Sequence, residues 1–289
     1  MKPLFMWAGG KNKMMKHYRP LMPKTIKTYS EPFFGGGAMF IEVITKYQPK
    51  KVYLNDINAG IMGIYTSVKT DHDEFVQILD SYSQEYLKLS KEDRKKYYYD
   101  LRNENAFNYS EWSTVKQNAV LYFLMKTAFN GIWQINKNTN GRFGTPCGLL
   151  NQTTEVYDKR NIKLWNEALN CSNVVLSNTD WSDVPVSDFT FLDPPYRDSF
   201  ADYNEAFPDE ELEKMISIVE KTYGVWLCNR DTDDGFFDNR KAIIYRFPVT
   251  YTAGRRKKTD NGYEAKKAVE ILMMADNQYT CTTSEKALQ

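Results

Sequence analysis

The sequence is poor in cysteine and histidine, and it has no long apolar run. Four cysteines, at positions 147, 171, 228 and 281, show no CxxC spacing, and His17 and His72 are the only histidines. This pattern argues against a disulfide framework or a zinc site and favours a reducing cytoplasm. No apolar stretch approaches the ~20 residues that a membrane span needs, and the N-terminus lacks the apolar core of a secretory signal. We therefore expect no metal site and no membrane anchor.

Acidic residues are missing from the first 30 positions, although the net charge of the whole chain is only +1. That stretch contains seven basic residues: Lys2, Lys11, Lys13, Lys16, Arg19, Lys24 and Lys27. A second basic cluster consists of Arg255, Arg256, Lys257 and Lys258, followed by Lys266 and Lys267. Localised positive charge on a neutral protein fits a surface that binds a polyanion. An ordinary solvated surface is the alternative interpretation of each cluster.

Residues 26–59 have the pattern of a nucleotide-binding βαβ unit. A short strand over 26–31 is followed by Pro32-Phe33-Phe34-Gly35-Gly36-Gly37, and the spacing of apolar residues predicts a helix over 38–47. A second strand over 52–54 ends at Asn55-Asp56. Strand, glycine loop, helix, strand and acid, in this order, indicate an α/β fold whose Asp56 binds a ribose. An ordinary glycine turn is the alternative.

The middle of the chain changes in character. Residues 71–130 are charged and aromatic with helical spacing, and the loop 136–142 is dense in turn formers, which predicts a hairpin tip. Strands are then expected at 174–177, 189–193, 225–228, 242–247 and 268–273, with an amphipathic helix over 209–223. We expect a catalytic domain formed by 1–65 and 151–275, a helical insert with a hairpin loop over 66–150, and a flexible tail over 276–289.

Asp193-Pro194-Pro195-Tyr196 closes the apolar strand 189–192. Two prolines cannot extend a β ladder, so an acid at the end of a core strand is followed by a rigid, open turn. Ligands collect at such carboxyl ends of strands in open α/β sheets. The Asp193 carboxylate and the Pro194 carbonyl could both accept hydrogen bonds from one exocyclic amine, with the Tyr196 ring against the attached base. A simple strand-to-loop turn is the alternative.

Two further pairs of residues are candidates for chemistry. Asp180-Trp181 follows the predicted strand 174–177, where the acid could accept a hydrogen bond from an adenine amine while the indole packs on the ring; Trp181 could equally be a core residue. Pro146-Cys147 invites comparison with a cysteine nucleophile, but it lies in a loop-rich stretch without a basic partner nearby in the sequence.

The combination of motifs resembles the Dam-type (alpha-group) DNA adenine-N6 methyltransferases over residues 4–274. The motifs, in chain order, are Phe5-x-Trp7-Ala8-Gly9-Gly10-Lys11, Glu31-Pro32-Phe33-x-Gly35-Gly36-Gly37, Asn55-Asp56, Phe129-Asn130-Gly131, Gly141-x-Phe143-x-Thr145-Pro146, Asp193-Pro194-Pro195-Tyr196 and Asn229. The resemblance implies a Rossmann-like S-adenosylmethionine-dependent methyltransferase fold, with a mixed, mostly parallel sheet, helices on both faces and a helical target recognition domain.

The resemblance also implies residue roles. The expected catalytic residues are Asp193, Pro194, Pro195 and Tyr196. The expected S-adenosylmethionine-binding residues are Trp7, Lys11, Pro32, Phe33, Gly35, Gly37, Asp56, Ile57, Asp180, Trp181 and Asp193. The expected contacts to double-stranded DNA are Phe129, Asn130, Gln134, Arg142, Pro146, Arg255, Arg256, Lys257 and Lys258. The expected enzyme is a monomer or a weak dimer on DNA, associated with the nucleoid of a bacterial cell or a phage-infected host.

Two departures from the family pattern concern the target sequence. Relatives that read GATC usually have a lysine at the position of Met6 and an arginine at that of Gln134. Arginine is the commonest specific contact to guanine, whereas glutamine prefers adenine, so a GATC target does not follow. Two rival functions are methylation of cytosine N4, disfavoured by the motif order and by Asp193 before Pro-Pro-Tyr, and a DNA-binding relative without turnover.

Overall fold

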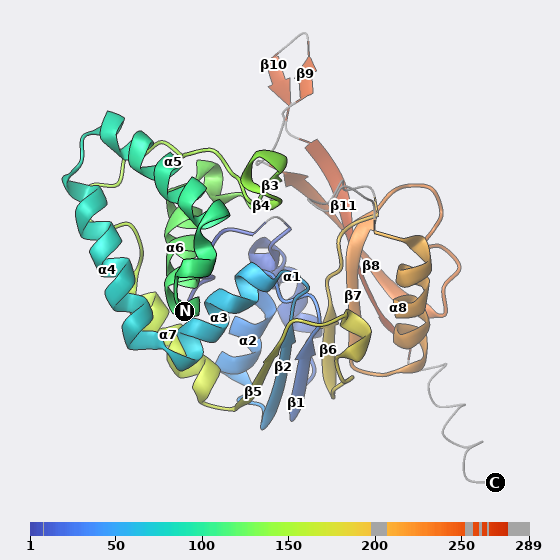
Figure 1. Cartoon of the computed structure of the whole chain (residues 1–289). Helices are drawn as coiled ribbons and strands as arrows, with labels where there is room; N and C mark the ends of the chain where they lie inside the picture. Colours follow the sequence, from blue (N-terminus) through green and yellow to red (C-terminus); the bar gives the residue numbers. More distant parts are fainter. Residues whose placement is uncertain (8, 198–206, 252–256, 260–261, 265, 277–289) are drawn as a thin grey trace. The chain divides into compact units, whose positions relative to one another are not determined.

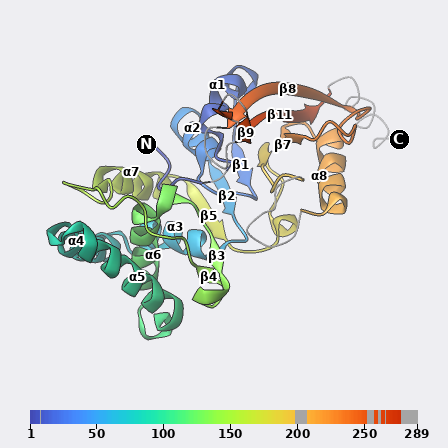
Figure 2. The ribbon, with the colours of Figure 1, turned by 90° about the horizontal axis from the view of Figure 1, so that it is seen from above.

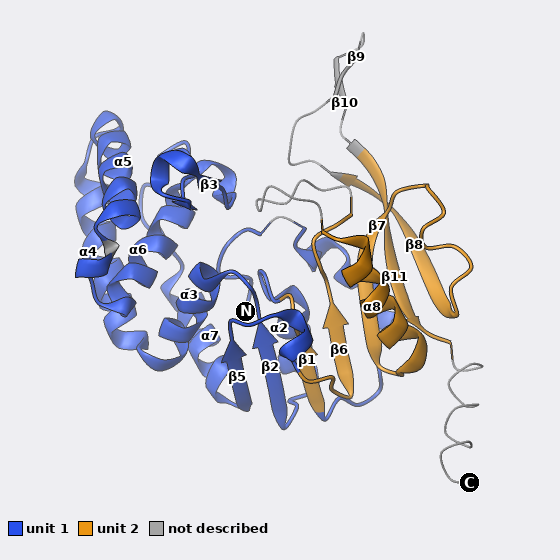
Figure 3. Ribbon diagram, turned by 45° about the vertical axis from the view of Figure 1, so that its right-hand side comes forward, with its two compact units in different colours: residues 1–27, 34–184 blue, residues 28–33, 185–289 orange. Residues whose placement is uncertain are grey.

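The computed structural model describes residues 1–7, 9–197, 207–251, 257–259, 262–264 and 266–276. The chain divides into two compact units, one formed by 1–27 and 34–184 and the other by 28–33 and 185–289 (Figure 3). The fold is α/β with a mostly parallel seven-stranded sheet, as predicted. No helix among the described residues is long and apolar enough to cross a membrane.

Unit 1 contains the parallel pair β2 (Lys51–Asn55) and β5 (Asn173–Ser177), paired in register from Lys51 and Asn173 to Asn55 and Ser177. Its helices include α2 (Ala38–Lys46), α3 (Ala59–Thr70) and α7 (Lys159–Asn170). Helix α3 begins where the Asn58 side chain accepts hydrogen bonds from the N–H groups of Gly60 and Ile61, at 3.0 and 3.2 Å. This cap satisfies donors that the first turn leaves unpaired.

The segment predicted as a helical insert consists of α4 (His72–Lys88), α5 (Lys91–Phe107) and α6 (Thr114–Thr127), which lie side by side in Figures 1 and 2. Helix α6 is the central one, because most of its circumference is buried. Ser90 and Ser113 cap the N-termini of α5 and α6. The predicted hairpin is present as β3 (Ile135–Asn136) and β4 (Arg142–Phe143), which pair antiparallel.

Unit 2 contains the parallel strands β1 (Thr28–Glu31), β6 (Phe189–Leu192) and β7 (Val225–Asp231). Strand β11 (Lys266–Ala275) pairs antiparallel with both β7 and β8 (Ala242–Tyr251). Helix α8 (Asp209–Lys221) packs on β7 and β11 through Leu212, Met215, Ile216 and Val219 (Figure 2). A small antiparallel pair, β9 (Lys257–Thr259) and β10 (Gly262–Glu264), was not predicted.

The remaining elements are short. They are η1 (Lys11–Lys13), α1 (Met15–Tyr18), η2 (Arg19–Leu21), η3 (Tyr109–Glu111), η4 (Phe129–Gly131), η5 (Lys137–Thr139) and η6 (Trp181–Asp183). The predicted DNA contacts Arg255 and Arg256 and most of the predicted tail, 277–289, lie outside the described residues. Lys257 and Lys258 lie in β9.

Candidate active site

The glycine loop is tied to the end of β2 by a buried carboxylate. Asp56 directly follows β2 and is 8% exposed. One carboxylate oxygen accepts a hydrogen bond from the Gly35 N–H at 2.8 Å, and the other accepts one from the Asn58 N–H at 2.9 Å. Burial raises the pKa of Asp56 from 3.8 to about 6, and the two N–H donors only partly oppose this. The pKa of Asp56 is therefore raised well above that of an exposed aspartate, a shift that is common among functional carboxylates.

An indole ring covers the glycine loop. Gly35 has φ +48°, and a Cβ there would lie 2.7 Å from Cδ1 of Trp7. Gly37, at φ +67°, would place a Cβ 2.8 Å from Trp165 and 2.9 Å from Phe34. The Tyr65 hydroxyl donates to the Gly35 carbonyl at 3.1 Å. The loop therefore requires glycine for both its backbone conformation and its close contacts.

Two predicted cofactor residues, Asp180 and Trp181, follow β5, the strand that pairs with β2. The side-chain oxygen of Asn55 accepts hydrogen bonds from the Ser177 hydroxyl at 2.8 Å and the Thr179 N–H at 3.0 Å, which joins the ends of β2 and β5. Beyond this junction Asp180 caps η6 by accepting from the Ser182 N–H at 2.9 Å. Trp181 is half-buried, and Ile57, beside Asp56, is 59% exposed. The carboxyl ends of two adjacent strands thus present acids beside apolar side chains.

The N-terminal basic stretch differs from a uniformly charged surface. Lys11 is 3% exposed, and its ammonium group donates to the Gly9 carbonyl at 2.7 Å. Lys2 forms an ion pair with Asp158 at 2.9 Å, and Arg19 forms one with Glu42 at 2.9 Å. The interpretation of all seven basic residues as one polyanion-binding surface is therefore wrong for Lys11, which is buried. Four other lysines of the stretch are exposed: Lys13, Lys16, Lys24 and Lys27.

Unit 2 places the Asp193 motif at the end of its central parallel strand. All four residues of β6 are buried; Asp193 is half-buried, and Tyr196 is 7% exposed. The Arg230 guanidinium lies over the Tyr196 ring at 5.1 Å. Such a cation–π contact holds the ring in place without using its hydroxyl. The motif is thus a fixed turn at the carboxyl end of a core strand, as its two prolines predict.

Sequence reasoning did not assign a role to the acid of the neighbouring strand. Glu31 ends β1, which pairs with β6, and is 3% exposed. It accepts a hydrogen bond from the Tyr29 hydroxyl at 2.7 Å. Burial, and next the Glu31 charge, hold the pKa of Tyr29 well above its usual value, and Asp193 adds to the effect. The available signal in the sequence was an acid at a strand end, followed by Pro32 and Phe33. In the structure Pro32 is buried, and the Phe33 ring contacts the Phe207 ring edge-on, with ring centres 6.1 Å apart.

The predicted DNA-reading residues of unit 1 lie on two connected turns. Phe129 is 49% exposed and Asn130 has a left-handed backbone, φ 52°. The Phe129 N–H donates to the carbonyl of Pro146, itself exposed, at 2.8 Å. On the β3–β4 hairpin the Gln134 side chain is exposed and that of Arg142 is half-buried. The Gln134 main chain is fixed by hydrogen bonds with Gly144 and Thr145, at 2.7 and 3.1 Å.

An aromatic chain links the glycine-loop cover to this hairpin. The rings of Trp7 and Trp133 lie 6.1 Å apart, and those of Trp133 and Phe143 lie 5.4 Å apart. Met6, next to Trp7, is 63% exposed and lies against Gly131, where an added Cβ would be 3.2 Å from that of Met6. The predicted cofactor segment and the predicted recognition turns are therefore packed on each other inside unit 1.

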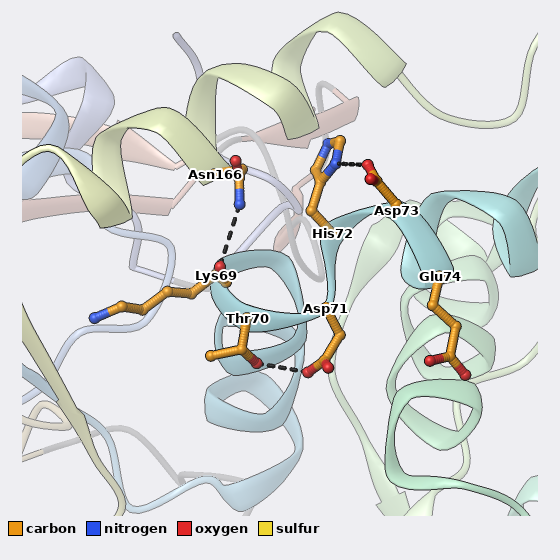
Figure 4. A pocket seen from close by; sticks show the side chains of 7 residues that line it. All are labelled: Lys69, Thr70, Asp71, His72, Asp73, Glu74 and Asn166. Carbon is orange, nitrogen blue, oxygen red and sulfur yellow. Dashed lines mark hydrogen bonds and ion pairs between the residues drawn. The ribbon is translucent and has the colours of Figure 1, made fainter.

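A surface cavity of about 310 Å³ lies elsewhere in unit 1, at the junction of α3 and α4 (Figure 4). Its lining consists of Lys69, Thr70, Asp71, His72, Asp73, Glu74 and Asn166. The Asn166 amide donates to the Lys69 carbonyl at 3.2 Å, and His72 contacts Asp73 at 2.8 Å. It contains none of the predicted site residues. Among the described residues, no group of three or more potential ligands could hold a metal ion.

Comparisons with known proteins identify the family of this chain. The type II methyltransferase M.MjaIII of Methanocaldococcus jannaschii is 33% identical over 91% of this chain and 97% of its own length. The type II methyltransferase M.CviBI of Paramecium bursaria Chlorella virus NC1A is 28% identical over 86% and 93%. The DNA adenine methylase of Escherichia coli K12 is 26% identical over 88% and 91%. Since the family of D12 class N6 adenine-specific DNA methyltransferases matches residues 7–243, the chain belongs to that family and is an adenine-specific DNA methyltransferase.

Proposed function

We propose that this chain methylates adenine at one specific duplex sequence, with the Asp193 turn receiving the reactive amine and the Asp56 region of unit 1 holding S-adenosylmethionine. The observation that carries the proposal is the Asp193 turn itself. A half-buried acid follows a fully buried strand, and the aromatic ring three residues later is held by Arg230. Burying a carboxylate costs folding free energy. Its presence at this strand end therefore favours a role in chemistry over a role in folding.

The cofactor assignment rests on the chemistry of the residues in unit 1. Gly35, lacking a Cβ, lets the backbone pass under Trp7, and α2 begins after Gly37 without a side-chain cap, so that the N–H groups of its first turn suit acceptor oxygens of a ligand. Asp56 provides an acceptor for ribose hydroxyls, as in other βαβ units. Exposed Ile57 and half-buried Trp181 offer apolar surface for an adenine ring, beside Asp180. Bound S-adenosylmethionine supplies a methyl group on a positively charged sulfur.

The residues of this chain have to activate a poor nucleophile. The lone pair of the adenine amine is delocalised into the ring. Hydrogen bonds from that amine to the Asp193 carboxylate and the Pro194 carbonyl localise the pair on nitrogen, and positioning of this kind can lower a barrier by several kcal/mol. The base has to leave the duplex to reach the strand end, which costs a few kcal/mol of stacking. Stacking on Tyr196 offsets part of that cost.

We propose DNA contacts for the recognition turns and the basic segments. Phe129 enters the space left by the displaced base, while Asn130, Gln134, Arg142 and Pro146 face the duplex. The segment 255–258 and the exposed N-terminal lysines contact phosphates, which position the protein without reading sequence. Residues 66–150 act as the target recognition domain and 1–65 with 151–275 as the catalytic domain. The enzyme works as a monomer or weak dimer in the cytoplasm, where nucleoid or phage DNA lies, and a GATC target does not follow from Met6 and Gln134.

Nucleoside mass spectrometry tests the reaction. Unmethylated plasmid DNA incubated with the chain and S-adenosylmethionine should gain N6-methyladenine; N4-methylcytosine in its place, or no product, would overturn the proposal. Asp193→Ala should abolish transfer and leave duplex binding intact. The matched control is Asp188→Ala, because Asp188 precedes the same strand at its opposite end, where its carboxylate accepts a hydrogen bond from the Thr28 N–H at 3.2 Å. Equal activity of the two variants would contradict the assignment of Asp193.

A further inference from the structure

The side chain that follows the Asp193 motif has an unusually large set of partners. The Arg197 guanidinium donates to both carboxylate oxygens of Asp209, at 2.7 and 2.8 Å. It also donates to the Thr232 hydroxyl at 2.9 Å and to Asp234 at 2.6 Å. Its carbon Cζ lies 3.9 Å from the centre of the Phe236 ring. Arginine suits such a site because its planar fork bonds in several directions while its face stacks on an aromatic ring.

These partners come from α8 and from the segment that follows β7, both in unit 2. Asp209 is the first residue of α8, where the helix dipole favours a carboxylate. Thr232, Asp234 and Phe236 follow β7, the strand that pairs with β6. The Arg197 N–H also lies 3.5 Å from the side-chain oxygen of Asn229, a fully buried residue of β7. The main chain of Arg197 is therefore attached to β7, and its side chain to α8 and to the segment after β7.

The other end of the motif is fixed by the sheet. Leu192, the last residue of β6, pairs with Leu227 of β7. Between Leu192 and Arg197 lie only the four motif residues, two of which are prolines with a restricted φ. The ion pairs hold the pKa of Asp209 below its ordinary value and that of Asp234 down at about 2, with hydrogen bonds from Arg197 as the first cause in both. Both carboxylates thus stay charged throughout the working pH range.

We propose that Arg197 is a positioning residue for methyl transfer: it clamps the far end of the Asp193–Tyr196 turn, so that the carboxylate and the Pro194 carbonyl keep the orientation that the adenine amine requires. This inference rests on the proposed role of Asp193. Arg197 touches neither the base nor the cofactor in this scheme. Its loss should slow the chemical step while binding is retained, because an error of about 1 Å in a reactive geometry can cost ~100-fold in rate.

The chain contains a matched control in Arg240. Its guanidinium also lies over the Phe236 ring, at 5.0 Å, and forms a two-pronged ion pair with Glu213 of α8 at 2.7 and 2.8 Å. The side chains of Arg197 and Arg240 are similarly covered, at 15% and 19% exposure. Arg240 belongs to the segment between β7 and β8 and is not continuous with the motif. A purely structural effect should therefore appear in both lysine variants.

The experiment compares Arg197→Lys with Arg240→Lys in the full chain. Unmethylated plasmid DNA and tritiated S-adenosylmethionine give single-turnover rates, and binding of the same DNA and of S-adenosylhomocysteine gives dissociation constants. We expect Arg197→Lys to lower the rate at saturation by about 10- to 100-fold, with dissociation constants within ~3-fold of the parent. Arg240→Lys should keep its rate within about 3-fold of the parent. Its melting temperature should fall by about as much as that of Arg197→Lys. Equal rates of the two variants, or a loss confined to binding, would overturn the proposal.

A second variant keeps the proposal testable if Arg197→Lys does not fold. Asp209→Asn combined with Asp234→Asn leaves Arg197 and its ring contact in place but removes both charges, with Glu213→Gln as its control. A slower single turnover in the double variant alone supports the clamp, and an unchanged one refutes it. The proposed function fails separately, if the parent chain forms no N6-methyladenine or if Asp193→Ala retains full activity.

Discussion

Lowering the pH from 7.5 to 5 should weaken cofactor binding through one group, Asp56. Its pKa of about 6 means that the carboxylate is about 97% ionised at pH 7.5 and about 9% ionised at pH 5. If the ionised form accepts the ribose hydroxyls, the association constant falls about 10-fold across this range. A carboxyl with the ordinary pKa of 3.8 would lose less than about a tenth of its affinity over the same interval.

The stability of the protein should respond in the opposite direction. Because the folded pKa of Asp56 is raised above its unfolded value, the folded state binds the proton more tightly. The contribution of Asp56 to the free energy of unfolding is therefore least favourable above pH 6 and improves as the pH falls through about 6 towards 3.8. The shift of about two pH units corresponds to about 3 kcal/mol at full protonation. Weaker binding with no matching loss of stability distinguishes this effect from acid unfolding.

Calorimetric titration with S-adenosylhomocysteine at pH 5 to 7.5, with a melting curve at each pH, measures both quantities. Asp56→Asn is the control, because an amide does not titrate; its affinity should be lower at pH 7.5 and flat across the range. Asp56 also accepts hydrogen bonds from the N–H groups of Asn58 and Gly35, so part of the affinity lost in Asp56→Asn comes from a less stable loop. The melting curves measure that part. A flat profile for the parent chain, or an equal slope for Asp56→Asn, would refute the reasoning.

Three further variants test other parts of the site. Gly37→Ala should lower the melting temperature, at a cost of about 1–3 kcal/mol, because its Cβ would meet Trp165 and Phe34; an unchanged melting curve contradicts this. Gln134→Arg should change the methylated sequences, read by methylation-sensitive sequencing, with turnover kept, and an identical map removes Gln134 from base reading. Phe129→Ala should reduce the fluorescence rise of 2-aminopurine placed at the target adenine, and a full rise would count against its role in opening the duplex.

Local signals in the sequence were enough to predict the elements that frame the site. The Pro194-Pro195 pair marks the end of β6, and the glycine run marks the turn before α2, since prolines and glycines restrict the backbone independently of distant contacts. The amphipathic spacing of α8 placed its start correctly at Asp209. Ends of strands were less accurate: β8 and β11 each extend beyond the predicted ranges, because they pair with each other over their whole length.

Contacts between distant residues could not be predicted in this way. The hydrogen bond from the Gly35 N–H to Asp56 spans 21 positions, and that from Arg197 to Asp234 spans 37. Lys11 looked like part of a charged surface, yet it is buried against its own turn. In each case the position of a charged side chain depends on the packing around it, which composition and periodicity do not encode.

The structure links Met6 and Gln134, the two positions that depart from the GATC pattern, through the contacts of their neighbours. Met6 lies against Gly131, directly after Asn130, and its neighbour Trp7 contacts Trp133, which precedes Gln134. Residues in contact generally have non-additive effects when they are substituted. Because Met6 and Gln134 are linked through the contact of their neighbours Trp7 and Trp133, we expect the effect of Gln134→Arg on site preference to depend on the residue at position 6. Since Trp7 also covers the glycine loop, the two positions that depart from the GATC pattern and the predicted cofactor loop belong to the same piece of structure.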